Sequence, residues 1–434
     1  MPFETYSFPE FGESYLRLAV PGGPEVYLIP KERSQIYALL QIPFGSIDTV
    51  YRIGGRVRRI PRGAAHFLEH KLFANEDGHD SLELLGQLGA NGNAYTSAHS
   101  TCYLFSCREH LAESLGELLR FVSRPYFTEQ NMDAERSVIA QEIAMYEDSP
   151  ATALYYLAVR AMYERHPLRD NICGTPASIA KLTPKSLHEI YKSFYHPCRW
   201  RLFLSGRIAP EEIEAIVSEY AVQGMTPEAM PRALPDEPLL PVKREVSRRM
   251  NVHQPLFALG LKLPPPSSDP EQNAREALAR DIVLAALLGK SGALHESLYA
   301  RGLIHSQLGS TVESMPGASY LLINGESDRP DEVLDEITRV LAETAEHGLP
   351  AKDFERMRRV AYADFLASLD STEELAEGFC SSLADGLDLF SLGRILGEID
   401  ADFAKELFRR DFDPARLVRA RILPKRKNRN GGNV

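Results

Sequence analysis

Residues 62–80 read RGAAHFLEHKLFANEDGHD and place two histidines and a glutamate within the five residues HFLEH. His66 and His70 are four residues apart, and Glu69 precedes the second histidine. If this stretch is helical, both imidazoles lie on one face of the helix, one turn apart. Two ligands at this spacing suit a tetrahedral zinc site, and a glutamate near the open position of the metal can act as a base. The alternative is an ordinary helix that carries two surface histidines and a solvated glutamate.

A catalytic zinc ion typically takes three protein ligands, so the two histidines need a third ligand from elsewhere in the chain. The helix predicted over 128–148 offers carboxylates, because one of its stripes mixes them with apolar residues at helical spacing. The members of this stripe are Glu135, Ile139, Glu142, Ile143 and Tyr146. Burial of an unpaired carboxylate is costly, whereas a carboxylate on a metal or beside one of its ligands is satisfied. The two patterns together favour the metal site over the ordinary helix.

The composition is that of a folded globular protein with at least two domains, since the chain has 434 residues and 44% of them are hydrophobic. A net charge of −11 disfavours nucleic acid and anionic membranes as partners. We find no charged start followed by an apolar core, no run of membrane-spanning length and no CxxC pair among the five cysteines. We therefore expect reduced thiols and a cytoplasmic location.

Strand-like and helix-like segments follow the same order in both halves of the chain. Strands are predicted within 25–30, 35–45, 93–107, 200–206, 257–263 and 319–327. Helices are predicted around HFLEH, over 81–90, 110–127, 128–148, 151–165, 183–195 and 273–288, and twice within 330–369. This repetition predicts a duplicated α+β unit.

The predicted domains are 1–225, which carries the zinc-type motif, and 246–423, which lacks it. Residues 226–245 are Pro-rich without periodicity and are predicted to be a linker. The basic tail 424–434 is rich in Gly and Asn, and we expect it to be disordered.

Several stretches resemble peptidase family M16, which includes pitrilysin, insulysin and mitochondrial processing peptidase. HFLEH matches the inverted zinc motif His-x-x-Glu-His of the inverzincins. The matching blocks are AAHFLEHKLF, GANGNAYTSAHSTCYLFSC, SRPYFTE, ERSVIAQEIAMYEDSP, GTPASIAKLTPKSLHEIYKSFYHP and LFLSG, in family order. They cover most of the first half, and the repeated second half extends the likeness over the chain. EHKLFANEDG, QEIAMYEDSP and LLGKSG are similar to bacterial YmfH-type members, the zinc-bearing subunits.

The resemblance implies an α+β fold with two homologous domains of the LuxS/metalloenzyme-like kind. Each domain would be a mostly antiparallel sheet packed with helices, and the chain would form half of a clamshell. By resemblance, one zinc ion per chain is bound by His66, His70 and Glu142, Glu69 is the general base and Glu135 supports the site. Glu147 is a rival third ligand, but it lies off the helical stripe.

The family's edge strand, which pairs with the substrate backbone, corresponds to NAYTS. The implied substrate-binding residues are Asn93, Ala94, Tyr95 and Thr96. An extended peptide would add a strand there with little sequence preference. His79, His99 and His110 lack a partner at ligand spacing, so we expect them to face solvent or line the cleft.

One segment departs from the family pattern. Catalytically complete members carry an Arg and a Tyr in an LR…GLAY segment of the second domain. The matching stretch here, residues 298–309, reads LYARGLIHSQLG, with His305 at the Tyr position and Arg301 out of register. In two-chain members a second chain supplies the Arg/Tyr pair, which predicts a heterodimer with an M16 homologue that lacks the zinc motif. The rival is a homodimer in which His305 replaces the tyrosine, since a neutral imidazole can donate a hydrogen bond.

The predicted function is a zinc endopeptidase that cleaves unfolded peptides or processes a leader peptide inside a closed chamber. A non-catalytic assembly subunit is the main alternative, although a scaffold needs none of the motif residues. A metal-dependent hydrolase of small molecules fits the zinc chemistry but not the peptide-pairing strand.

Overall fold

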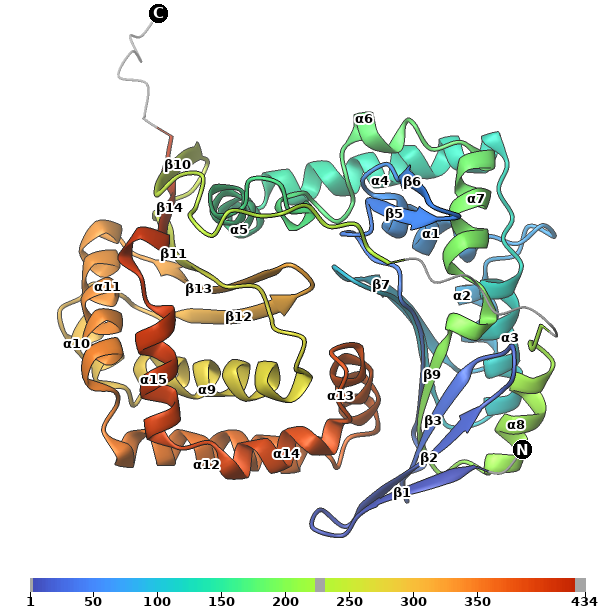
Figure 1. Ribbon diagram of the computed structural model, residues 1–434. Coiled ribbons are helices and arrows are strands. Elements are labelled where there is room, and N and C mark those ends of the chain that lie inside the picture. Colours follow the sequence, from blue (N-terminus) through green and yellow to red (C-terminus); the bar gives the residue numbers. More distant parts are fainter. Residues whose placement is uncertain (1–2, 223–230, 426–434) are drawn as a thin grey trace, which may run out of the picture. The chain divides into compact units, whose positions relative to one another are not determined.

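The computed structural model describes residues 3–222 and 231–425. The predicted linker 226–245 therefore lies outside the described residues as far as residue 230, and the predicted tail lies outside them from residue 426. The chain forms two compact units (Figure 1). Unit 1 consists of residues 1–143, 170–234 and 363–394, and unit 2 of residues 144–169, 235–362 and 395–434. Residues 144–169 precede the predicted linker but belong to unit 2, and residues 363–394 follow it but belong to unit 1, so these two segments are swapped between the units. The domain boundaries given in the sequence analysis stay a prediction.

Unit 1 is built on a seven-stranded sheet in the order β1-β2-β3-β9-β4-β8-β7. Its strands are β1 (Glu4–Phe8), β2 (Glu13–Ala19), β3 (Glu25–Pro30), β4 (Ile36–Ile42), β7 (Asn91–Thr96), β8 (Thr101–Cys107) and β9 (Arg201–Gly206). Only the β3–β9 pair is parallel. The strand β4, which lies within the predicted strand 35–45, is buried at every position. Strand β7 lies at one edge of the sheet.

The helices of unit 1 cover both faces of this sheet. They are α1 (Ala64–Leu72), α2 (Ser81–Gln87), α3 (Leu111–Ser123), most of α4 (Glu129–Asp148), α6 (Pro176–Ile179), α7 (Pro184–Phe194), α8 (Pro210–Ser218), α13 (Thr372–Ala384) and the start of α14 (Leu389–Glu398), beside the hairpin β5 (Val50–Ile53) and β6 (Arg56–Arg59). Helices α1 and α3 pack on β8, and α13 packs on β4 and β9. On β8, Tyr103 meets the rings of Phe73 and Phe121, whereas the preceding residue, Cys102, meets Cys380 of α13. Successive residues of a strand point to opposite faces, so α13 covers the face opposite α1 and α3.

Unit 2 contains a five-stranded sheet in the order β10-β14-β11-β13-β12. Its strands are β10 (Glu245–Met250), β11 (Leu256–Leu263), β12 (Gly309–Met315), β13 (Ala318–Glu326) and β14 (Leu417–Pro424). Its helices are α5 (Pro150–Met162), α9 (Pro270–Leu288), α10 (Ala293–Ala300), α11 (Pro330–His347), most of α12 (Ala351–Ser368) and α15 (Ala401–Asp411). In the part of the chain that the structure describes, we find no helix long and apolar enough to cross a bilayer.

The two sheets share one topology. In unit 1 the series β3-β9-β4-β8-β7 contains one parallel pair followed by three antiparallel pairs. The series β10-β14-β11-β13-β12 of unit 2 has the same order and the same directions. The swapped helices also correspond, since α13 packs on β4 and β9 and α5 packs on β11 and β14. The α+β fold with two related, mostly antiparallel sheets is as predicted from the sequence.

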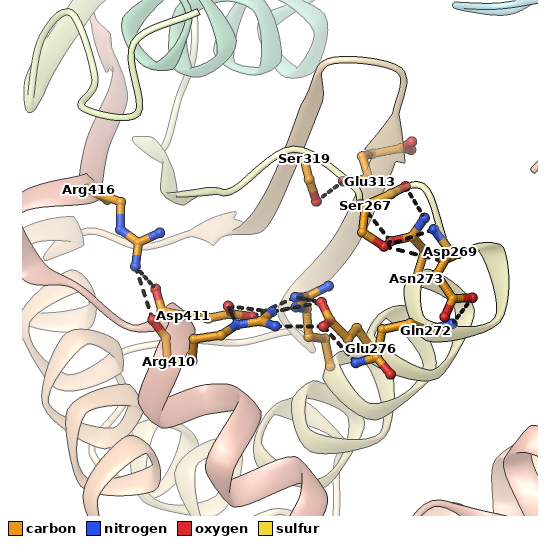
Figure 2. A network of polar contacts seen from close by, with 11 residues as sticks. Ser267, Asp269, Gln272, Asn273, Glu276, Glu313, Ser319, Arg410, Asp411 and Arg416 are labelled. Carbon is orange, nitrogen blue, oxygen red and sulfur yellow. Dashed lines mark hydrogen bonds and ion pairs between the residues drawn. The ribbon is translucent and has the colours of Figure 1, made fainter.

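A charged network links α9 to α15 within unit 2 (Figure 2). Arg410 donates to both carboxylate oxygens of Glu276, at 2.6 and 2.7 Å, and Arg280 Nε donates to Asp411 Oδ2 at 2.8 Å. Burial acts to raise the pKa of the Glu276 carboxyl, but the bonds and charges of its neighbours, Arg410 first, outweigh burial and lower this pKa to about 2.

A second charged pair fixes part of the predicted linker to unit 2. The Glu237 carboxylate accepts hydrogen bonds from three backbone N–H groups, those of Glu164, Arg165 and His166, at 2.8 to 2.9 Å. It also accepts a bond of 2.7 Å from Lys262 Nζ. The two side chains are 6% and 2% exposed, so this is a buried ion pair whose anion is fully hydrogen-bonded.

Candidate metal centre

Helix α1 buries the first four HFLEH residues in unit 1 and leaves the fifth, His70, half-buried. It begins after Gly63, whose φ of 86° is favourable for glycine alone. A Cβ at this position would lie 2.4 Å from the Cys173 carbonyl oxygen, so the tight approach also requires glycine. His66 and Glu69 are buried on α1, in contrast to the solvated side chains that an ordinary surface helix would carry.

Three candidate ligands converge at this point. Glu142 Oε2, on α4, lies 3.5 Å from His66 Nε2 and 3.6 Å from His70 Nε2. The ligand atoms of these residues all lie within 4.8 Å of one another, and no other group of three or more His, Cys, Asp or Glu meets this spacing among the described residues. Ligand atoms about 2.1 Å from a tetrahedral zinc ion are about 3.4 Å apart. The two nitrogen–oxygen separations match this spacing, so the two imidazole nitrogens and the carboxylate oxygen would hold a zinc ion that keeps an open position.

Glu135 orients the second histidine. Its Oε1 lies 2.9 Å from His70 Nδ1, which leaves His70 Nε2 directed to the Glu142 carboxylate, and its Oε2 accepts a bond of 3.3 Å from Lys71 Nζ. Burial acts to raise the pKa of Glu135, but the bonds to His70 and Lys71 outweigh it and lower this pKa. For His70, burial acts to lower the pKa, and the hydrogen bond and charge of Glu135 raise it above the usual value. A carboxylate behind a ligating imidazole is a common support in zinc sites.

His66 and Glu69 occupy less polar surroundings. Burial, together with the neighbouring His70, lowers the pKa of His66 to about 3, so its imidazole is neutral, which is the form that binds metals. Its Nδ1 is buried and has no hydrogen-bond partner among the described residues. Burial raises the pKa of Glu69, while a bond from Thr96 Oγ1 to Glu69 Oε2, 2.5 Å long, acts in the opposite direction. A carboxylate with a raised pKa is suited to proton transfer near neutral pH.

The predicted substrate residues Asn93, Ala94, Tyr95 and Thr96 form the last two-thirds of the edge strand β7. Thr96 reaches Glu69, as described above. Tyr95 instead donates to Glu377 of α13 at 2.6 Å.

The remaining sequence candidates lie elsewhere. Glu147 is exposed on α4 and does not belong to the ligand group. His79 and His110 are exposed beside Asp77 and Glu113, and His99 is half-buried. In unit 2, His305 lines an open pocket of about 670 Å³, and Arg301 pairs with Glu336 at 3.5 Å.

Sequence reasoning missed three contacts of the site. Lys71 binds the carboxylate of Glu135, Cys173 Sγ lies 3.7 Å from His66 Nε2, and Glu377 binds Tyr95. The adjacency of Lys71 to His70 was an available signal. Cys173 and Glu377 are brought in by tertiary packing and have no local signal in the sequence.

The chain matches family models, curated relatives and solved structures. Residues 59–176 match the family described as Insulinase (Peptidase family M16), and residues 181–360 match the Peptidase M16 inactive domain. A Bacillus subtilis protein named as the uncharacterized zinc protease YmfH is 32% identical over 425 residues, which cover 96% of this chain and 98% of that protein. The crystal structure of an M16-like peptidase from Alicyclobacillus acidocaldarius has a TM-score of 0.90 at 29% identity, covering 98% of this chain and 99% of the other.

The same fold occurs in longer proteins. Pitrilysin has a TM-score of 0.74 at 15% identity, and the match covers 98% of this chain but 46% of pitrilysin. The two related sheet-and-helix units of this chain therefore have the M16-like fold. The chain belongs to peptidase family M16, as the resemblance of its motifs predicted.

Proposed function

We propose that this protein is a zinc-dependent endopeptidase and the zinc-bearing subunit of a heterodimer that cleaves unfolded peptides or processes a leader peptide. The observation that carries the proposal is the convergence of His66, His70 and Glu142 at tetrahedral spacing beside the buried Glu69. The names of its relatives as zinc proteases support the same metal and the same class of reaction.

His66, His70 and Glu142 would hold one zinc ion. When bound, zinc supplies Lewis-acid chemistry that makes water more acidic and polarises the scissile carbonyl. Glu69 takes the proton of the attacking water and gives it to the leaving amine. Its Oε2 is held by Thr96, which leaves Oε1 for the water. Glu135 keeps His70 in the tautomer and orientation that present Nε2 to the metal.

The edge strand β7 supplies the peptide-binding surface in this proposal. One side of β7 pairs with β8, and the other side faces no strand in the described sheet. An extended peptide can add to this edge through backbone hydrogen bonds, which give affinity with little dependence on sequence. Because Thr96 of β7 binds Glu69, a peptide on this edge would run past the proposed base.

The heterodimer is proposed because one segment of the chain departs from the Arg/Tyr pattern of complete family members. Its segment 298–309 carries His305 where complete family members have tyrosine. A zinc-free M16 homologue that supplies an Arg/Tyr pair would complete the oxyanion site. The alternatives are a homodimer that uses His305 and a non-catalytic scaffold subunit, and the test below distinguishes both from the heterodimer. We also propose a cytoplasmic location.

The test is cleavage of a quenched fluorogenic peptide library by zinc-loaded protein, alone and with an M16 homologue that lacks the zinc motif. Glu69→Gln should abolish cleavage while zinc stoichiometry stays at one per chain. Glu142→Gln should abolish zinc binding as well, whereas Glu147→Gln, on the same helix, should change neither. Cleavage by the chain alone would contradict the heterodimer and favour the homodimer. Zinc binding without cleavage under any of these conditions would favour the scaffold.

A further inference from the structure

The edge strand β7 is held on both of its faces. On one face, Thr96 Oγ1 donates to Glu69 Oε2 on α1 at 2.5 Å. On the other face, the neighbouring Tyr95 donates its hydroxyl to Glu377 Oε2 on α13 at 2.6 Å. Alternation along a strand requires these two side chains to point in opposite directions. The last two residues of β7 are therefore hydrogen-bonded to two different helices.

Glu377 also connects this edge to the centre of the sheet. Its second oxygen, Oε1, accepts a bond of 2.7 Å from the hydroxyl of Tyr37 on β4. Strand β4 lies two places from β7 in the sheet, with β8 between them. Burial, followed by the Glu377 hydrogen bond, raises the pKa of Tyr37, so its hydroxyl stays protonated and can donate. The half-buried carboxylate thus bridges an edge strand and a central strand.

Helix α13 is a firm support for this bridge. Phe379, two residues after Glu377, packs against Tyr15 and Tyr27 with ring centroids 4.8 and 5.4 Å away. Cys380 Sγ lies 4.0 Å from Cys102 Sγ of β8. These contacts anchor the helix in the core of unit 1, so Glu377 has a fixed position from which to hold β7.

We propose that Glu377 is a positioning residue for the peptidase reaction, which sets the position of β7, and of a peptide paired with it, relative to the Glu69 carboxylate. The inference rests on the proposed function. Edge strands are the least protected strands of a sheet, and a displacement of about 1 Å at a reacting centre can cost about a hundredfold in rate. The attachment to α13 counteracts this mobility at the residue next to Thr96.

The kinetic test compares Glu377→Ala and Tyr95→Phe with the exposed neighbour variant Glu373→Ala, in the zinc-loaded assembly that cleaves the fluorogenic peptide. We expect Glu377→Ala to raise KM about tenfold, the effect of one lost hydrogen bond to a charged group, and Glu373→Ala to leave KM unchanged. Tyr95→Phe should raise KM in the same direction, and the double variant should be no worse than Glu377→Ala. Glu377→Gln, which keeps one acceptor oxygen, should restore part of the loss. A fall in kcat alone, in proportion to the folded fraction, would overturn the proposal.

Amide hydrogen exchange provides a readout that does not depend on activity. Glu377→Ala and Tyr95→Phe should speed exchange in residues 91–96 and leave residues 201–206 of β9 unchanged, with zinc stoichiometry and thermal midpoint close to wild type. Unchanged exchange in 91–96 would refute the role of Glu377. Failure of the wild-type assembly to cleave any peptide would refute the proposed function instead, while the exchange data would still decide whether Glu377 holds the strand.

Discussion

Replacement of Lys262 by Met should destabilise unit 2, because it leaves the buried carboxylate of Glu237 without its cation. Methionine keeps the length and the apolar stem of the side chain, so the packing changes little. Loss of one partner of a buried ion pair costs about 3–5 kcal/mol. Three backbone N–H groups still bind the carboxylate, so we expect the lower end of this range, about 3 kcal/mol.

The double variant Lys262→Met/Glu237→Gln measures the interaction energy between the two side chains separately from their interactions with the rest of unit 2. A neutral amide at position 237 leaves no unpaired charge after the lysine is removed. The double variant should therefore be more stable than the sum of the two single effects predicts, by about 1–3 kcal/mol. Lys290→Met, at an exposed lysine of the same unit, is the matched control and should change stability by less than about 0.5 kcal/mol.

Urea unfolding followed by far-UV circular dichroism measures these free energies. Trp200 is the single tryptophan of the chain and belongs to unit 1, so its fluorescence follows that unit separately. We expect the dichroism midpoint of Lys262→Met to fall further than the fluorescence midpoint. A loss below about 1 kcal/mol, or strictly additive single effects, would refute the assignment of a coupled buried pair.

Three further predictions concern the charged network and the metal centre. The folded pKa of Glu276, about 2, lies below its unfolded value of about 4.5. The stability that ionised Glu276 contributes is therefore full above about pH 4.5 and is lost as the pH falls towards 2. The difference in unfolding free energy between wild type and Glu276→Gln, measured as a function of pH, should shrink over this window. Glu135→Gln should weaken zinc affinity by about 10–100-fold in a chelator competition, with Glu147→Gln unchanged; equal affinities would exclude a supporting role for Glu135. Gly63→Ala should destabilise the protein by about 1–3 kcal/mol and lower zinc stoichiometry, because φ is positive and the Cys173 carbonyl is too close; a wild-type melting curve would contradict this.

Local pattern was sufficient to predict much of the fold. The strand within 35–45, the strands within 93–107 and the helix predicted over 128–148 all appear where the sequence places them. The spacing within HFLEH and the Glu135–Glu142 stripe also named the side chains that the structure brings together on α1 and α4. Helical and strand periodicity carries this information because each pattern fixes which residues share a face.

The pattern could not predict which partner each face meets. Helix α13 has an apolar stripe around Phe379, but periodicity does not say which sheet it covers. Its placement on β4 and β9, and the contact between Glu377 and the edge strand 282 residues earlier in the chain, depend on tertiary packing alone. The buried pair of Lys262 and Glu237 has the same origin, since one member lies in a segment that reads as a linker.

The swap of α13 into unit 1 sets the order of events during synthesis. The face of the sheet that α13 covers is rich in aromatic residues, including Tyr15, Tyr27 and Phe203. The other segments of unit 1 are complete at residue 234, but its last segment ends at residue 394, which is 160 residues later (394 − 234). At roughly 5–20 residues per second the ribosome needs about 8–32 s to deliver it. During this interval the nascent chain presents an uncovered aromatic surface, so chaperones that bind apolar segments should associate with ribosomes halted between these two points and leave once α13 emerges.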